Sequence, residues 1–156
     1  MHSGQLRRAT TADAARVRDL SRAAYAKWAS LIGREPLPMT VDYDRAVVEH
    51  IIHLLEENEQ LIALIETIPK KDHLLIENIA VRPDQQGKGL GDRLLVHAEE
   101  LARSLGFEEI QLYTNSAFAS NLAFYAKRGY EEYRRGTIVP GTVTVFMKKR
   151  ISQATC

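Results

Sequence analysis

Three glycines alternate in the stretch Gln86-Gly87-Lys88-Gly89-Leu90-Gly91, which lies between a predicted strand and a predicted helix. The first amide N–H groups of a helix have no partner within the helix, and glycines allow an anion to approach them closely. Lys88 adds a positive charge to this predicted anion cradle. On these residues alone, the alternative interpretation is a turn that binds no ligand.

The segments on either side of the glycines have clear periodicity. A helix is predicted directly after them and ends near Gly106, because apolar residues recur every three or four positions. Its stripe consists of Leu90, Leu94, Leu95, Ala98, Leu101, Ala102 and Leu105. Before the glycines, short polar breaks separate three β-like segments at residues 51–55, 60–67 and 73–81. The simplest arrangement of these segments is an antiparallel meander.

The N-terminal third predicts a short strand at residues 5–9 and two helices. Thr11 is a suitable N-cap for the first helix, which Gly33 ends. Its predicted core face carries Val17, Leu20, Ala24, Trp28 and Leu31. Two prolines make residues 34–39 a loop, and a second helix is predicted from residues 40–42 to about Glu49.

The C-terminal part predicts a strand at residues 109–114 and a helix at 116–128 that Gly129 closes. A hairpin follows, with strands at 130–135 and 142–148 around Pro140-Gly141. Its outer strand would leave a sheet edge that needs protection, which makes a homodimer plausible. Together the elements indicate an α/β fold with a mixed, mainly antiparallel central sheet and flanking helices.

Length and composition favour one globular domain over residues 1–156, because 45% of the residues are hydrophobic and 26% are charged. The formal net charge of +1, with both signs interspersed, gives no reason to expect nucleic acid or a membrane surface as a partner. The only cysteine is Cys156, so no intramolecular disulfide can form. The polar N-terminus and the lack of a long apolar run then favour a cytoplasmic protein.

Other binding and catalytic motifs match poorly. The spacing GxGxG differs from the GxGxxG of dinucleotide-binding folds, and GxxxxGK[ST] is absent. His50 and His53 lack a carboxylate or cysteine pattern around them, so no metal is predicted. Because no GxSxG motif is present, we expect direct transfer chemistry without an acyl-enzyme.

Three motifs in order resemble those of the GNAT superfamily of acetyltransferases. Residues 86–91 fit its pattern Q/R-x-x-G-x-G/A, and residues 76–83 are similar to the strand that precedes that pattern. Asn121-Leu122-Ala123-Phe124-Tyr125, followed by Gly129-Tyr130, resembles the later element N-x-x-F-Y-x-x-x-G-F/Y. The close resemblance covers about residues 74–133, whereas the N-terminal third matches only in the order of its elements.

The resemblance implies a sheet whose fourth and fifth strands splay apart, with the pantetheine arm of acetyl-coenzyme A (acetyl-CoA) in the gap and its pyrophosphate over the cradle. The cofactor-binding residues that it implies are Ile79, Ala80, Val81, Gln86, Gly87, Lys88, Gly89, Leu90, Gly91, Asn121 and Phe124. Asp92 departs from the family pattern, since a carboxylate is awkward beside a phosphate, and we expect it to turn away.

Amine attack on a thioester needs a neutral amine and a proton for the departing thiolate. Tyr125 is the predicted proton donor, because a phenol with a pKa of about 10 is nearly matched to a thiol with a pKa of about 8.5. Glu77 is the predicted base, acting directly or through water, and His73 is the alternative. A catalytically silent acyl-CoA-binding module is the competing interpretation of the whole chain.

The acceptor is expected to bind near the first two helices and their loop. The predicted lining residues are Tyr25, Trp28, Arg34, Met39, Asp42 and Tyr43. Acidic Asp42 suits a cationic amine and Arg34 suits a carboxylate, so amino-acid-like molecules and peptide N-termini both remain open.

Overall fold

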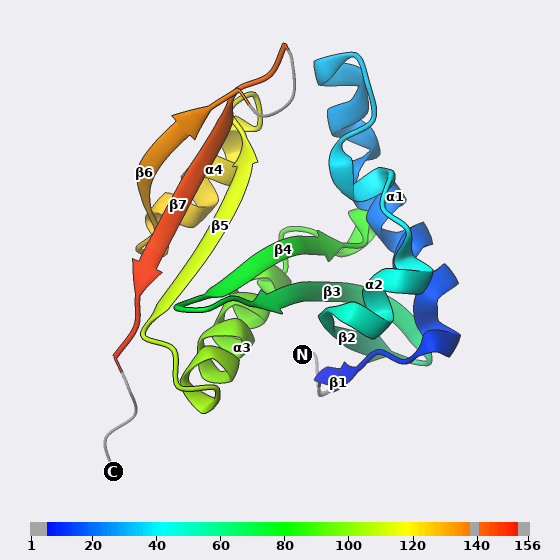
Figure 1. The fold of residues 1–156 in the computed structure, drawn as a ribbon. Helices are drawn as coiled ribbons and strands as arrows, with labels where there is room; N and C mark the ends of the chain where they lie inside the picture. Colours follow the sequence, from blue (N-terminus) through cyan, green and yellow to red (C-terminus); the bar gives the residue numbers. More distant parts are fainter. Residues whose placement is uncertain (1–5, 138–140, 153–156) are drawn as a thin grey trace.

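A computed structural model describes residues 6–137 and 141–152 of the chain, and a twisted seven-stranded sheet lies at its centre (Figure 1). The strands are β1 (Leu6–Arg8), β2 (Ile51–Glu57), β3 (Gln60–Pro69), β4 (Leu74–Val81), β5 (Glu109–Asn115), β6 (Glu131–Gly136) and β7 (Thr144–Arg150). Their order in the sheet is β1-β2-β3-β4-β5-β7-β6. Every neighbouring pair is antiparallel except β4 and β5, which run parallel. The predicted mixed, mainly antiparallel sheet is therefore confirmed.

Helices cover both faces of the sheet (Figure 1). They are α1 (Ala14–Ile32), α2 (Tyr43–Glu49), α3 (Leu90–Ser104) and α4 (Ala119–Lys127), with short 3₁₀ turns at Thr11–Asp13, Leu37–Met39 and Pro83–Gln85. One core packs α1 and α2 against β2 and β3, around buried Val17, Tyr43 and Leu64. The other packs α3 against the opposite face, around Leu94, Ala98 and Ile110, and side chains of α4 join its rim.

The splay between β4 and β5 begins at Glu77. The two strands pair only from Leu74↔Ile110 to Ile76↔Leu112, although both continue beyond these residues. On the other side of β4, Ile76 faces Thr67 and Asn78 faces Glu66, so that Glu77 is an unpaired bulge residue. A bulge bends its strand and reverses the alternation of side chains. Accordingly β4 separates from β5 where the extra residue is inserted, which confirms the predicted splay (Figure 1).

The strands and helices match the sequence prediction closely, and three details were wrong. Thr11 is not an N-cap: Thr10 caps the 3₁₀ turn Thr11–Asp13, where the Asp13 carboxylate accepts from the Thr10 N–H at 2.8 Å, and Asp13 is the N-cap of α1. Leu31 and Leu105 were assigned to buried stripes, yet they are 57% and 45% exposed. Both lie in the last turn of a helix or just beyond it, where the apolar face has passed the edge of the sheet. The fourth helix begins at Ala119, after a turn, and not at Ser116.

Three sequence predictions fall on positions outside the described residues. They are the start of the first strand at Gln5, the hairpin residue Pro140, and the cysteine at position 156. No helix among the described residues combines the length and the apolarity that a bilayer crossing requires.

Candidate active site

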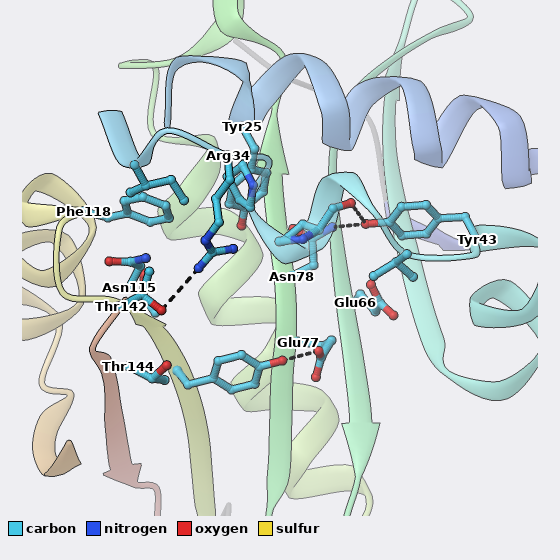
Figure 2. A pocket seen from close by; sticks show the side chains of 16 residues that line it. Tyr25, Arg34, Tyr43, Glu66, Glu77, Asn78, Asn115, Phe118, Thr142 and Thr144 are labelled. Atoms are coloured by element: carbon cyan, nitrogen blue, oxygen red, sulfur yellow. Dashed lines mark hydrogen bonds between the residues drawn. The ribbon is translucent and has the colours of Figure 1, made fainter. Parts of the chain in front are cut away.

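Two cavities meet where β4 and β5 separate. The larger one, about 540 Å³, lies between the N-terminus of α3, α4 and the second half of α1. The smaller one, about 90 Å³, lies under the loop after α1, between β4 and β5 (Figure 2). Tyr25 lines both of them. Both pockets therefore border β4 beside the splay, with Tyr25 between them.

The glycine segment forms one wall of the larger cavity. Gly89 is the N-cap of α3 with φ of 82°, and Gly87 has φ of 79°, a left-handed conformation that residues with a Cβ rarely adopt. No side chain caps the first turn, so its N–H groups are left for a ligand. Lys27 of α1 lies across the cavity, and its Nζ donates to the Gln86 Oε1 at 3.2 Å. This wall presents the free N–H groups and the positive charge that the predicted anion cradle requires.

The free edge of β4 forms a second wall. Arg82 N–H donates to the Ile62 carbonyl at 2.8 Å, and the alternation of an antiparallel ladder then directs the backbone of Ala80 toward β3. The backbone groups of Ile79 and Val81 consequently face the gap. Their carbonyls accept from the Tyr25 hydroxyl and the Gln86 side-chain amide, each at 3.1 Å. The Ala80 side chain, in contrast, is buried against α1.

Helix α4 supplies the third wall through Asn121, Phe124 and Tyr125. The Tyr125 ring is half-buried and lies edge-on to Phe124 and Tyr130, with centroids 5.3 and 5.9 Å away. Burial raises the pKa of Tyr125 well above its ordinary value of about 10. Among the described residues, no group hydrogen-bonds the Tyr125 hydroxyl. The phenol thus keeps its proton at neutral pH and has it available for a ligand.

Asp92 forms an ion pair with Arg128 at the rim of the larger cavity. Its second carboxylate oxygen accepts from Arg128 Nη2 at 2.8 Å, and the guanidinium holds the pKa of Asp92 below its usual range. Arg128 also donates to the Phe124 carbonyl and lies 3.7 Å above the Phe124 ring centroid. The carboxylate that departed from the family pattern is thereby neutralised, and the ion pair ties α3 to α4.

Glu77 lies in the smaller cavity and is hydrogen-bonded to the Tyr113 hydroxyl from β5 (Figure 2). Burial, followed by the hydrogen bond to the Glu77 carboxylate, raises the pKa of Tyr113 far above its ordinary value. Tyr113 therefore remains a phenol that donates to Glu77 and holds this carboxylate in one orientation.

Two further polar side chains line the smaller cavity from β3 and β4. Glu66 is 1% exposed and its Oε2 lies 2.5 Å from His50 Nδ1, while burial raises the pKa of Glu66. Asn78 is 3% exposed and donates from Nδ2 to Ser21 and Tyr43, at 3.0 and 3.3 Å. The Asn78 Oδ1 atom is buried without a partner among the described residues. Such an acceptor is costly to bury unless a ligand uses it.

The predicted acceptor residues separate into three groups. Arg34 and Tyr43 line the smaller cavity, as does Tyr25. Trp28 lines the larger cavity instead, stacked on Phe118 at 4.4 Å. Met39 and Asp42 line neither. Met39 accepts from Arg22 through its carbonyl, and Asp42 caps α2 by accepting from the N–H groups of Asp44 and Arg45.

His73, the alternative base, lies in neither lining. Its Nδ1 is 2.6 Å from the carboxylate of exposed Asp72, on the turn that precedes β4. In the described part of the chain, no group of three His, Cys, Asp or Glu side chains could hold a metal ion.

The sequence interpretation missed Tyr113, Glu66, Asn78 and Lys27. Glu66 interrupts the apolar run of β3, and a lone carboxylate in such a run signals a buried polar site. Tyr113 alternates with Ile110 and Leu112, which places it on the opposite face of β5. The sequence could not predict on which face of the sheet Asn78 lies, because the bulge at Glu77 reverses the alternation of side chains along β4.

The splayed sheet with a glycine cradle at the mouth of α3 defines the class of the molecule: it has the acyl-CoA N-acyltransferase fold. A family model described as "Acetyltransferase (GNAT) family" matches residues 15–130. The chain belongs to this acetyltransferase family.

Solved structures agree in fold over nearly the whole chain. One is the PaiA N-acetyltransferase of Thermoplasma acidophilum in complex with coenzyme A, with a TM-score of 0.80 at 18% identity, covering 95% of this chain and 99% of that one. Another is the ribosomal-protein-S18-alanine N-acetyltransferase of Escherichia coli, with a TM-score of 0.74 at 23% identity, covering 97% and 96%. A third is a GNAT family acetyltransferase from Elizabethkingia anophelis with acetyl-CoA bound. Its TM-score is 0.75 at 17% identity, and the match covers 97% of this chain and 100% of that one.

A closer relative in sequence is the uncharacterized protein YxbD of Bacillus subtilis (strain 168). It is 36% identical over 77 residues, which span 49% of this chain and 47% of that protein. The match thus extends over about half the length of this relative.

Proposed function

We propose that this acetyltransferase moves an acetyl group from acetyl-CoA directly to a primary amine. The observation that carries the proposal is the meeting of two cavities at the splay, one with an anion cradle and one with a carboxylate. A donor in the larger cavity and an amine in the smaller one would approach each other across Tyr25. No covalent acyl-enzyme is then required.

The donor binds in the larger cavity. Its pyrophosphate lies over the amides of the cradle, where the positive end of the α3 dipole and Lys27 favour an anion. Its pantetheine amides pair with the backbone of Ile79 and Val81, which faces the gap. Similar structures hold coenzyme A or acetyl-CoA, and this supports the assignment of the donor.

The reaction forms an N–C bond, breaks the C–S bond and removes two protons from the ammonium form of the amine. Glu77 accepts the first proton, directly or through water, and the neutral amine attacks the thioester carbonyl. A backbone N–H of the free β4 edge near Ile79 stabilises the oxyanion. The nitrogen loses its second proton to solvent as the N–C bond forms. The Tyr125 hydroxyl donates a hydrogen bond to the departing thiolate.

The raised pKa of Tyr125 refines its role. Full transfer of its proton to a thiolate is more uphill than for a phenol in water, because the thiol pKa is only about 8.5. A hydrogen bond from the Tyr125 hydroxyl to the sulfur stabilises the leaving charge without complete transfer. Glu77 is favoured over His73 as the base, since His73 lies outside both cavities.

Substitution of Tyr125 by phenylalanine tests the leaving-group role. We expect kcat to fall at least tenfold, while the Kd for acetyl-CoA, measured by calorimetry, changes less than threefold. Tyr133→Phe is the matched control, because the hydroxyl of this exposed tyrosine on β6 donates to Gln111, outside both cavities. An unchanged kcat in Tyr125→Phe would remove Tyr125 from the mechanism. If the wild type binds acetyl-CoA but acetylates no amine in a broad screen, the chain is a silent acyl-CoA-binding module and the proposal fails.

A further inference from the structure

The smaller cavity has charges of opposite sign at its two ends. Arg34 reaches into it from the loop after α1, on the side of β5 and β7 (Figure 2). Glu66 and Asn78 lie on the side of β3 and β4, and Glu77 lies below them (Figure 2). Among the described residues, the lining of this cavity contains no lysine or histidine, although His50 contacts Glu66 from outside it. A ligand that crosses it would meet a cation at one end and carboxylates at the other.

Arg34 is held in place without being neutralised. Its Nη2 donates to the Thr142 hydroxyl at 3.2 Å and its Nη1 donates to the Glu35 carbonyl at 3.5 Å. Neither acceptor is charged, and within residues 6–137 and 141–152 no carboxylate pairs with this guanidinium. A half-buried guanidinium positioned in this way has remaining N–H groups that suit a ligand carboxylate.

The opposite end has acceptors in excess. Asn78 Oδ1 is buried without a partner among the described residues, and Glu66 lines the same cavity as a buried side chain whose Oε2 lies 2.5 Å from His50 Nδ1. Glu77 adds a second carboxylate, fixed by Tyr113. An ammonium group carries three donors and no acceptor, so it matches this end of the cavity.

The size of the cavity limits the ligand. One buried water molecule needs about 10–15 Å³ of such space, and the cavity has about 90 Å³. Apolar groups of Ile32, Pro36, Val41 and Phe118 close it over the sheet. The enclosed space therefore suits a short molecule.

We propose that the acceptor is a small amino carboxylate, an amino-acid-type molecule whose carboxylate binds Arg34 and whose amine lies between Asn78, Glu66 and Glu77. This inference rests on the proposed function, since it names the substrate class of the same site. Arg34 is a specificity-determining residue in this arrangement and takes no part in proton transfer.

Matched triplets of compounds test the inference. Each triplet contains an amino acid with an α-, β- or γ-amino group, its carboxamide, and the amine without the carboxyl group. Release of the coenzyme A thiol gives kcat/KM for each compound. We expect the best amino carboxylate to exceed both of its neutral counterparts at least tenfold. Equal or faster turnover of the neutral amines would overturn the inference and leave the proposed function intact, whereas no turnover of any amine would overturn the proposed function itself.

Arg34→Gln supplies the second arm. We expect this variant to raise KM for the amino carboxylate at least tenfold, to leave KM for acetyl-CoA within twofold, and to lose the preference for the carboxylate. Arg34→Lys should recover part of that preference, because it restores the charge. Arg18→Gln, on an exposed part of α1 outside both cavities, is the matched control. Equal losses for the acid and for its amide in Arg34→Gln would show that Arg34 acts structurally and would contradict the assignment.

Discussion

Gly91 shows how one missing side chain fixes the contact between α3 and α4. A Cβ at this position would lie 2.8 Å from the Phe124 Cζ, and Arg128 holds that ring from above. Gly91→Ala gains up to about 1 kcal/mol of helix propensity, and the forced shift of the ring costs about 1–3 kcal/mol. We therefore expect a net loss of about 1 kcal/mol in the free energy of unfolding, measured by urea denaturation, together with weaker binding of acetyl-CoA.

Gly136→Ala is the comparison for this variant. Gly136 also lacks a left-handed φ, and among the described residues no heavy atom outside its chain neighbours lies within 4 Å of a Cβ built there. Its free energy of unfolding should not decrease. A Gly91→Ala protein as stable as the wild type would mean that the α3–α4 contact adapts freely.

Individual residues also show where sequence reasoning ends. The conformation of Gly89 and its neighbours could be predicted directly, because it depends on local backbone geometry at the start of a helix. Arg34 could be named as a carboxylate ligand, but the acidic end of its cavity was sought at Asp42. The acidic end lies instead at Glu66 and Glu77. Both are more than thirty positions beyond Arg34 in the sequence, and they share a cavity with it only after β3 and β4 pair.

Among the elements, β4 explains most of the difference between a regular sheet and this one. Its apolar pattern predicts a strand correctly, yet the pattern does not reveal that Glu77 is an extra residue opposite β3. That bulge ends the pairing with β5, sends Asn78 to the face of α1, and turns the backbone of Ile79 toward the gap. The motif marks the glycine wall of the larger cavity, whereas the place of Asn78 in the smaller cavity was missed because the bulge reverses the alternation of side chains.

Asp42 is the N-cap of helix α2, so variants at this position can distinguish a capping role from acceptor binding. The Asp42 carboxylate accepts from Asp44 N–H at 3.1 Å and from Arg45 N–H at 3.4 Å. We expect Asp42→Ala to lower the free energy of unfolding by about 1 kcal/mol, whereas Asp42→Asn, which keeps the capping oxygen, should lose less than about 0.5 kcal/mol. Chemical denaturation of the two variants measures the difference.

Kinetics of the same pair then address the original expectation that Asp42 binds the acceptor. Because Asp42 lines neither cavity, Asp42→Asn should leave the acceptor KM within twofold of the wild type. A large increase in both variants, despite normal stability of Asp42→Asn, would instead place its charge at the acceptor.

For the molecule as a whole, we expect stability to depend on pH through the core under α3. The core under α3 has a histidine pair at its edge, with His53 of β2 and His97 of α3 packed at 4.3 Å between ring centroids. His53 Nδ1 and His97 Nε2 are buried without partners among the described residues. Burial, and then the neighbouring His97, lowers the pKa of His53 to about 4, and burial also lowers the pKa of His97.

These lowered pKa values predict a loss of stability in mild acid. An unfolded histidine has a pKa of about 6.5, so between that value and about 4 the unfolded chain binds a proton at position 53 that the folded chain does not. Stability then rises with pH across this window, is complete above about 6.5, and falls as the solution is acidified. His53→Leu removes this contribution, which amounts to about 1–3 kcal/mol between pH 7 and pH 4.5.

Urea denaturation of the wild type and His53→Leu at pH 7.0, 5.5 and 4.5 measures the effect. A change in packing alters the free energy of unfolding of the variant by the same amount at all three pH values. The informative quantity is therefore the difference between the two proteins in the slope of this free energy against pH. We expect the free energy of unfolding of His53→Leu to fall less steeply toward pH 4.5, with a residual slope from His97. Parallel curves would mean that the pair is protonated in the folded state as readily as in the unfolded chain. In that case the contact between α3 and β2 would have to open in mild acid without loss of the fold, since two imidazolium groups cannot remain packed at this distance away from water.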